Sequence, residues 1–204
     1  MRIMSRVLMV AAMAAAAASC GDVVRDSRAP VFLVMDSLTG APSGGFGAGT
    51  FSGTLFSDVI VNVTSPEPCT PATPCPSVFA DRGQAVLHLD SKNVGLAPTS
   101  NNQVTISRYH VTFRRADGRK TEGVDVPYAF DGAVTALVAP SGPTTIGFEL
   151  VRHVAKEESP LVQLISSRAI ISTIADVSLY GTDQVGNAVN VSGSMTVEFG
   201  NFGD

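Results

Sequence analysis

The side chains best suited to chemistry are three cysteines and three histidines, and their spacing limits what they could do. Cys20 ends the alanine-rich run "AAAAASC", whereas Cys69 and Cys75 lie close together in "SPEPCTPATPCPS". The histidines are far apart and form no zinc-binding pattern: His88, His110 and His153. No G-x-S-x-G motif offers a serine nucleophile, and the stretch "GGFGAG" lacks the spacing of a phosphate-binding loop. We therefore predict a protein that is not an enzyme and carries no cofactor.

The segment before Cys20 has the layout of an export signal. Arg2 and Arg6 precede residues 7–19, which carry no charge. An apolar run of this length would form a helix of roughly 20 Å, short of the ~30 Å hydrocarbon core of a bilayer. A positive start, an apolar stretch and small residues at the end are typical of a secretory signal peptide, here residues 1–19. A membrane-spanning anchor remains the alternative.

The last residues of this segment, "AASC" at 17–20, resemble the lipobox of bacterial lipoprotein precursors, with Ala17 where that family more often has a large aliphatic residue. The resemblance implies lipidation of the Cys20 sulfur, cleavage before that residue, acylation of the new N-terminus by a chain such as palmitate, and a membrane anchor. Residues 20–29 would then be a lipidated tether. Gly21 follows the cysteine directly, which by the same resemblance favours the outer membrane, on its periplasmic or surface face, over the inner membrane. An ordinary signal peptide, with Cys20 uninvolved, stays open.

The other two cysteines are separated by five residues in a proline-rich segment, which indicates a stiff extended loop. In the oxidising environment expected of an exported protein, this spacing allows a disulfide. We predict that Cys69 and Cys75 form a structural disulfide. A metal-binding pair would need further ligands, and no histidine lies near them in the sequence.

The charge balance bears on the choice of partner. Residues 1–19 contain two arginines and no acidic residue, so without them the formal charge falls from −4 to −6. A mildly acidic body lacks the basic face that nucleic-acid binding needs. No later apolar run reaches membrane-spanning length. The expected partners are therefore the membrane, through the lipid anchor, and an envelope protein or polysaccharide, but not nucleic acid.

Residues 30–204 contain β-branched runs separated by Gly, Pro, Asn and Asp. Strands are expected at 31–38, 84–94 and 104–113, and alternation is clear in the second of these. A bulge is expected near Ser107-Arg108 because the apolar parity changes there. The dipeptide Asp117-Gly118 predicts a hairpin turn, with 124–130 as the returning strand and Pro127 placing that strand at an edge. About nine strands without a convincing helix predict an all-β antiparallel sandwich. One large sandwich or two small ones would both fit.

The C-terminal stretch "VSLYGTDQVGNAVNVSGSMTV" alternates on both sides of a turn. It resembles the last hairpin of bacterial immunoglobulin-like and fibronectin type III-like domains, which often carry D-x-x-G-N between their final strands. Asp183, Gly186 and Asn187 match that pattern, and the resemblance implies an immunoglobulin-like sandwich. Asp183 and Asn187 are also weak candidates for a calcium site, although such residues more commonly stabilise turns.

A second surface feature is the basic cluster in "RRADGRK", at the predicted hairpin tip: Arg114, Arg115, Arg119 and Lys120. It could contact anionic lipid or polysaccharide, but a solvated tip is the simpler interpretation. The sequence as a whole predicts a non-catalytic cell-envelope lipoprotein that presents a β-sandwich to a protein or surface polymer. The alternative is a lipoprotein whose sandwich binds a small ligand or calcium.

Overall fold

The computed structural model describes residues 29–93, 95–97 and 99–203. The expected signal peptide and Cys20 lie outside these residues. The described part contains ten strands, one short α-helix and two 3₁₀ turns: β1 (Val31–Ala41), β2 (Thr54–Asp58), β3 (Val61–Val63), β4 (Cys75–Ser77), β5 (Asp81–Ser91), η1 (Ser100–Asn102), β6 (Val104–Arg115), β7 (Phe130–Val138), β8 (Thr144–Val151), α3 (His153–Glu157), η2 (Leu161–Leu164), β9 (Ile171–Asp183) and β10 (Ala188–Gly200).

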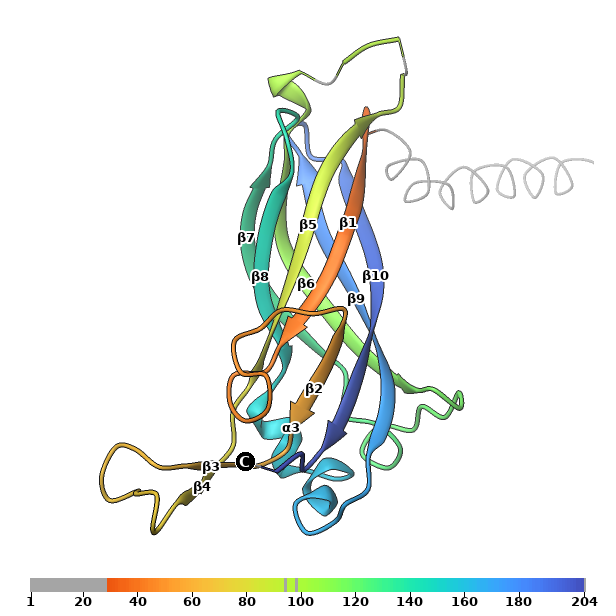
Figure 1. Ribbon diagram of the computed structural model, residues 1–204. Helices are drawn as coiled ribbons and strands as arrows, with labels where there is room; N and C mark the ends of the chain where they lie inside the picture. The colour runs from red at the N-terminus through yellow and green to blue at the C-terminus, as the bar shows by residue number, and fades with distance from the viewer. Residues whose placement is uncertain (1–28, 94, 98, 204) are drawn as a thin grey trace, which may run out of the picture.

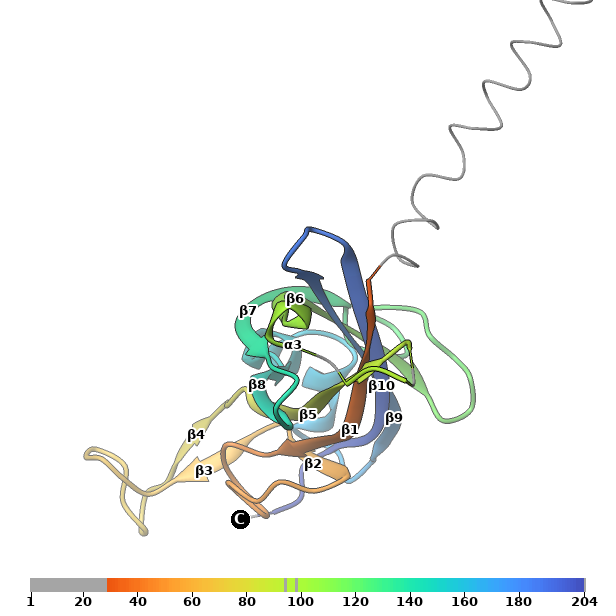
Figure 2. The same ribbon diagram turned by 90° about the horizontal axis from the view of Figure 1, so that it is seen from above.

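The strands form three sheets (Figures 1 and 2). The five-stranded sheet has the order β2-β10-β9-β6-β7 and curls into a half-barrel, and the three-stranded sheet β1-β5-β8 lies against its hollow side. A small third sheet pairs β3 with β4. The prediction of a β-rich fold is confirmed. The immunoglobulin-like arrangement is not shown by these sheets, and β2 pairs with β10 in parallel.

Alternating side chains form the core between the two larger sheets. In β5 the inward side chains Ala85 and Leu87 are fully buried, and in β9 Val177 and Leu179 are buried in the same way. These residues belong to one hydrophobic cluster that draws on both sheets. Because β5 and β9 bury every second residue, removing this apolar area from water favours one pairing register for these strands.

The expected bulge in β6 is confirmed: its pairing with both neighbours shifts register between Ile106 and Arg108. The expected hairpin partner is wrong, because β6 pairs with β7, and residues 116–129 form the connecting loop. Within that loop the carbonyl of Thr121 accepts hydrogen bonds from the amides of Val124 and Asp125. Local turns therefore use the backbone groups that a strand would have needed, although the apolar residues alternate.

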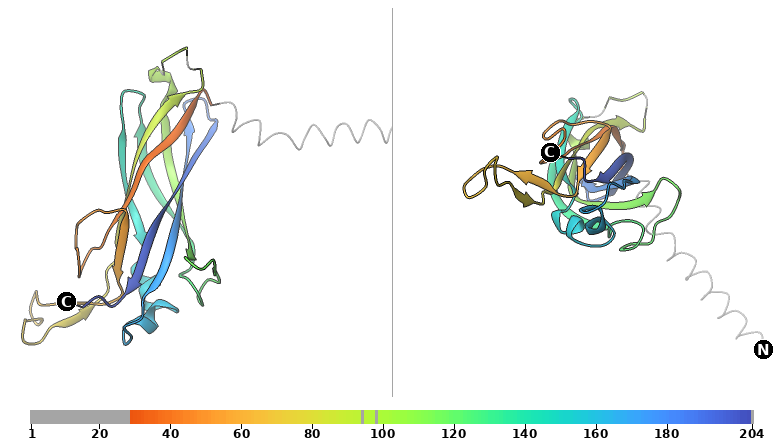
Figure 3. Two further views of the ribbon diagram at one scale, coloured as in Figure 1. Left: turned by 45° about the vertical axis from the view of Figure 1, so that its right-hand side comes forward. Right: turned by 60° about the horizontal axis from the view of Figure 1, so that its bottom comes forward.

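The long strands give the body two ends (Figures 1 and 3). At the end that we call proximal, the chain enters β1, and the β9–β10 turn lies beside it. The opposite end, which we call distal, carries the β3–β4 hairpin, α3, η2 and the loop 116–129. Within the described residues, no helix has the length and hydropathy needed to cross a bilayer.

Candidate functional site

The distal end contains a closed cluster of polar side chains. The ammonium Nζ of Lys156, on α3, lies 2.8 Å from Oδ2 of Asp81, at the start of β5. It also donates a 2.8 Å hydrogen bond to the carbonyl of Asp58, at the end of β2. The hydroxyl of Ser57 donates to the same Asp81 oxygen at 2.6 Å. Lys156 and Asp81 are each 1% exposed, so this cluster joins α3 to β2 and β5 inside the protein.

Burial dominates the electrostatics of the cluster. Removal from water raises the pKa of Asp81, while the Lys156 ammonium and the hydroxyl of Ser57 oppose that rise. The backbone amide of Ser43 adds a longer contact to Oδ1 of Asp81 at 3.3 Å. Serine, lysine and aspartate together could in principle support nucleophilic chemistry. Here the group has no access to solvent, so its evident role is to fix the distal elements.

An open groove lies on the outer face of the three-stranded sheet, next to this cluster. It crosses β5 and β8 and has a volume of about 560 Å³. We call it the β5–β8 groove. Arg82 and Gln84 face it from β5, Gly147 and Glu149 face it from β8, and Phe51 borders it from the loop 42–53. This is a concave surface in which aromatic rings and several polar groups meet, which is the usual composition of a ligand site.

The predicted disulfide is confirmed: Cys69 and Cys75 are bonded, with an S–S distance of 2.04 Å. The bond closes the loop that precedes β4, and β4 then pairs with β3. The resulting hairpin projects from the distal end of the body (Figure 1).

The proposed calcium candidates meet in the β9–β10 turn, at the proximal end. Oδ1 of Asp183 accepts hydrogen bonds from the backbone amides of Val185 and Asn187, at 3.1 and 2.8 Å. Its Oδ2 accepts a 2.7 Å bond from the side-chain amide of Asn187. Both carboxylate oxygens are therefore engaged in holding the turn. Within the described residues, no group of three or more His, Cys, Asp or Glu side chains is arranged to hold a metal ion.

The histidines of β5 and β6 lie on the outside of the body, each beside an aspartate. Nδ1 of His88 lies 2.7 Å from Asp36, and this hydrogen bond raises the pKa of the imidazole. Nδ1 of His110 lies 3.2 Å from Asp131. The third, His153, begins α3 at the distal end. These separate positions do not bring the histidines into one site.

The basic residues of "RRADGRK" are largely neutralised by neighbouring carboxylates. Arg114 is paired with Asp176 at 2.9 Å. Arg119 and Arg115 both approach Asp117, at 2.8 and 3.4 Å. The hydrogen bonds from Arg119 lower the pKa of Asp117 to about 2, so this carboxylate stays ionised at any physiological pH. The pairing favours a solvated loop over a free cationic surface.

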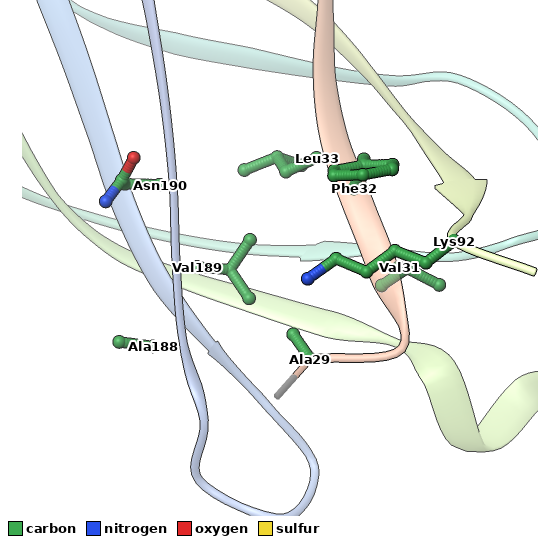
Figure 4. Close-up of a pocket in the computed structure, with 8 residues that line it drawn as sticks. All are labelled: Ala29, Val31, Phe32, Leu33, Lys92, Ala188, Val189 and Asn190. Carbon is green, nitrogen blue, oxygen red and sulfur yellow. The ribbon is translucent and has the colours of Figure 1, made fainter. Parts of the chain in front are cut away.

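A smaller pocket of about 180 Å³ lies at the proximal end, where the chain enters β1 (Figure 4). It opens between the first residues of β1, Val31 to Leu33, and the start of β10, Ala188 to Asn190. These two strands lie side by side, and no ladder joins them in the described part of the chain. The pocket therefore marks a seam that side-chain packing closes.

Sequence reasoning predicted neither Lys156 nor the groove. Lys156 lies in the charged segment "HVAKEESP", which is typical of a solvated turn, and its partner Asp81 is far away in sequence. A lysine preceded by Val154 and Ala155 in a one-turn helix was a weak signal, since a short helix can bury only one side. No protein-family model, curated protein or solved structure matches the chain.

Proposed function

We propose that the chain is a non-catalytic lipoprotein of the bacterial cell envelope, anchored through Cys20, which presents its β-rich body to an envelope protein or polysaccharide. The observation that carries this proposal is that the two ends of the body differ. The chain from the expected anchor enters at the proximal end, while the disulfide-closed hairpin projects from the distal end (Figure 1). Strands β9 and β10 each span 13 residues, which at ~3.3 Å per residue corresponds to about 40 Å between the two ends.

The chemistry of the distal cluster supports a structural role for these residues over a catalytic one. Ser57, Asp81 and Lys156 are all enclosed, with Ser57 fully buried. A substrate would need access to the serine hydroxyl, and here the hydroxyl donates its hydrogen bond to a buried carboxylate. The arrangement is therefore better suited to stiffening the distal loops than to acyl transfer.

The lipobox resemblance at 17–20 supports the anchor, and Gly21 supports the outer membrane as its location. Two or more acyl chains on Cys20 would hold the protein stably, whereas one chain binds only weakly. The relation of the C-terminal hairpin to immunoglobulin-like domains also remains a proposal, supported by Asp183 and Asn187 in the turn.

Metabolic labelling with an alkyne fatty acid tests the anchor. The wild-type chain should be labelled and processed, and Cys20→Ser should lose the label and keep its signal segment. Cys69→Ser serves as the matched control, because its thiol belongs to the distal disulfide and its loss leaves labelling intact. Labelling that persists in Cys20→Ser would overturn the anchor.

Photo-crosslinking in cells tests the presentation of the distal end. A photoreactive residue replaces Val124 in the distal loop or Val185 in the proximal turn, which are 67% and 82% exposed. Both valines are well exposed and lie at opposite ends of the body, which makes them a matched pair. A defined envelope product at Val124 and none at Val185 is expected. The same products at both positions would show that contact does not depend on the distal end.

A further inference from the structure

We infer that the β5–β8 groove is a binding site for a neutral glycan strand. The inference rests on the proposed function, since it names the ligand class that a displayed envelope protein would contact. Its starting point is a set of three planar polar groups on neighbouring positions of two paired strands. Arg82 and Glu149 are register partners in the β5–β8 ladder, and Gln84 is paired with Gly147.

These three side chains keep their full hydrogen-bonding capacity. Arg82 and Glu149 have opposite charges and are register partners, yet among the described residues they form no ion pair with each other or with a third group. The Gln84 amide likewise has no side-chain hydrogen bond within the described part. A guanidinium, a carboxylate and a carboxamide therefore converge on one groove with donors and acceptors available.

The floor and one border of the groove suit a flat, partly apolar ligand. Gly147 occupies an outward position of β8, and a Cβ added there would meet nothing within 4 Å. The missing side chain leaves the sheet backbone open to close approach. Phe51 borders the groove from the loop 42–53, with the Arg82 guanidinium 5.8 Å from its ring centroid. Because the chain contains no tryptophan, an exposed phenylalanine is the available stacking surface.

A sugar ring matches this combination. The C–H face of the sugar packs on an aromatic ring. Each sugar hydroxyl can donate and accept a hydrogen bond, so a planar group such as a guanidinium or carboxylate can bind two neighbouring hydroxyls at once. Arg82 and Glu149 offset each other and Gln84 is uncharged, so the groove has no net charge that would favour an anionic or cationic polymer, and a neutral one suits it. An extended peptide usually binds by pairing with the edge strand of a sheet. This groove instead lies on a sheet face that includes the central strand β5, so it does not suit that mode of peptide binding.

Binding of linear oligosaccharides of glucose and of N-acetylglucosamine, measured by calorimetry on the full chain, tests the inference. The detergent must lack a sugar headgroup, which would compete for the groove. At least one oligosaccharide should bind, and Gly147→Arg should weaken binding by more than about tenfold. Gly142→Arg is the matched control, because a Cβ at Gly142 also meets nothing within 4 Å and the residue lies outside the groove.

A second pair of variants tests the stacking surface. Phe51→Ala should weaken binding by about tenfold, while Phe46→Ala, on the same loop and 60% exposed, should not. Unchanged thermal unfolding of all four variants would show that the fold is intact. Failure of the wild-type chain to bind any of these oligosaccharides at millimolar concentration, or equal binding by Gly147→Arg, overturns the inference. Lipid labelling and crosslinking at Val124 do not use the groove, so their success with no glycan binding would remove this inference alone.

Discussion

Replacing Lys156 with methionine should destabilise the protein strongly at neutral pH and weakly in acid. Methionine keeps an unbranched apolar stem of similar length but leaves the Asp81 carboxyl, 1% exposed, without its ammonium partner. Breaking a buried pair from one side typically costs about 3–5 kcal/mol. Asp81 can limit this cost by taking up a proton. At pH 7, protonating a carboxyl with an unfolded-state pKa of about 3.9 costs roughly 4 kcal/mol, which sets an upper bound on the charge contribution.

The pH dependence follows from the sign of the shift. Burial raises the pKa of Asp81 in the folded state, so the folded variant binds a proton more readily than the unfolded chain. The free energy of unfolding of the variant is therefore highest below the pKa that Asp81 has in the unfolded chain, and it falls as the pH rises through the pKa of Asp81 in the folded state. The wild-type chain should show the same trend more weakly, because Lys156 opposes the rise of the Asp81 pKa. At pH 4.5 the cost of protonating the Asp81 carboxyl, which is the upper bound on the charge contribution, drops to about 1 kcal/mol.

Urea unfolding followed by circular dichroism at pH 4.5 and pH 7 measures this difference. We expect Lys156→Met to lose about 3–4 kcal/mol at pH 7 and about 1 kcal/mol at pH 4.5. The double variant Lys156→Met/Asp81→Asn removes the ionisable carboxyl and should lose the pH dependence. A loss below about 1 kcal/mol at pH 7, or the same loss at both pH values, would refute the reasoning that a buried charge is left uncompensated.

Three further predictions concern other parts of the body. A Cβ at Gly132 would lie 2.2 Å from the Tyr109 ring. Gly132→Ala should therefore lower the free energy of unfolding, measured by urea titration, by about 1–3 kcal/mol. A smaller change would mean that the ring moves freely. By NMR, the pKa of the His88 imidazole should lie above the ordinary histidine value of 6.5, and Asp36→Asn should lower that pKa. No change in the variant would show that Asp36 is not the main partner of His88. Reducing the Cys69–Cys75 disulfide should increase amide exchange in the distal hairpin while the core stays protected, because the bond closes a loop of only six residues' separation; global unfolding would contradict this.

Much of the fold could be predicted because single strands carry their own signal. Ala175, Val177 and Leu179 alternate in the sequence and are buried in β9, since one face of that strand covers the core. The parity change at Ser107 likewise announced the bulge of β6. Alternation was misleading in the loop 116–129, where Val124 is 67% exposed and local turns hold the backbone. Alternation identifies a strand only when a sheet face is present to bury it.

The candidate sites were less predictable, because they depend on contacts between distant parts of the chain. The predicted disulfide joined residues that are near neighbours in sequence, so spacing alone sufficed. The pair Lys156 and Asp81 forms only after α3 folds back on the start of β5. The groove depends on the register that places Arg82 opposite Glu149, and no sequence pattern specifies that register.

The pairing of β1 with β5 determines how the body would respond to a pulling force. The chain enters β1 at the proximal end, and β5, which carries one wall of the groove, is its antiparallel neighbour. Tension between an anchored N-terminus and a ligand in the groove would run along this pair and slide the two strands past each other. Bonds perpendicular to the pull are then strained together, whereas peeling would strain them one after another. The path avoids the seam between β1 and β10, so a tethered molecule could resist drag without straining a boundary that no ladder joins.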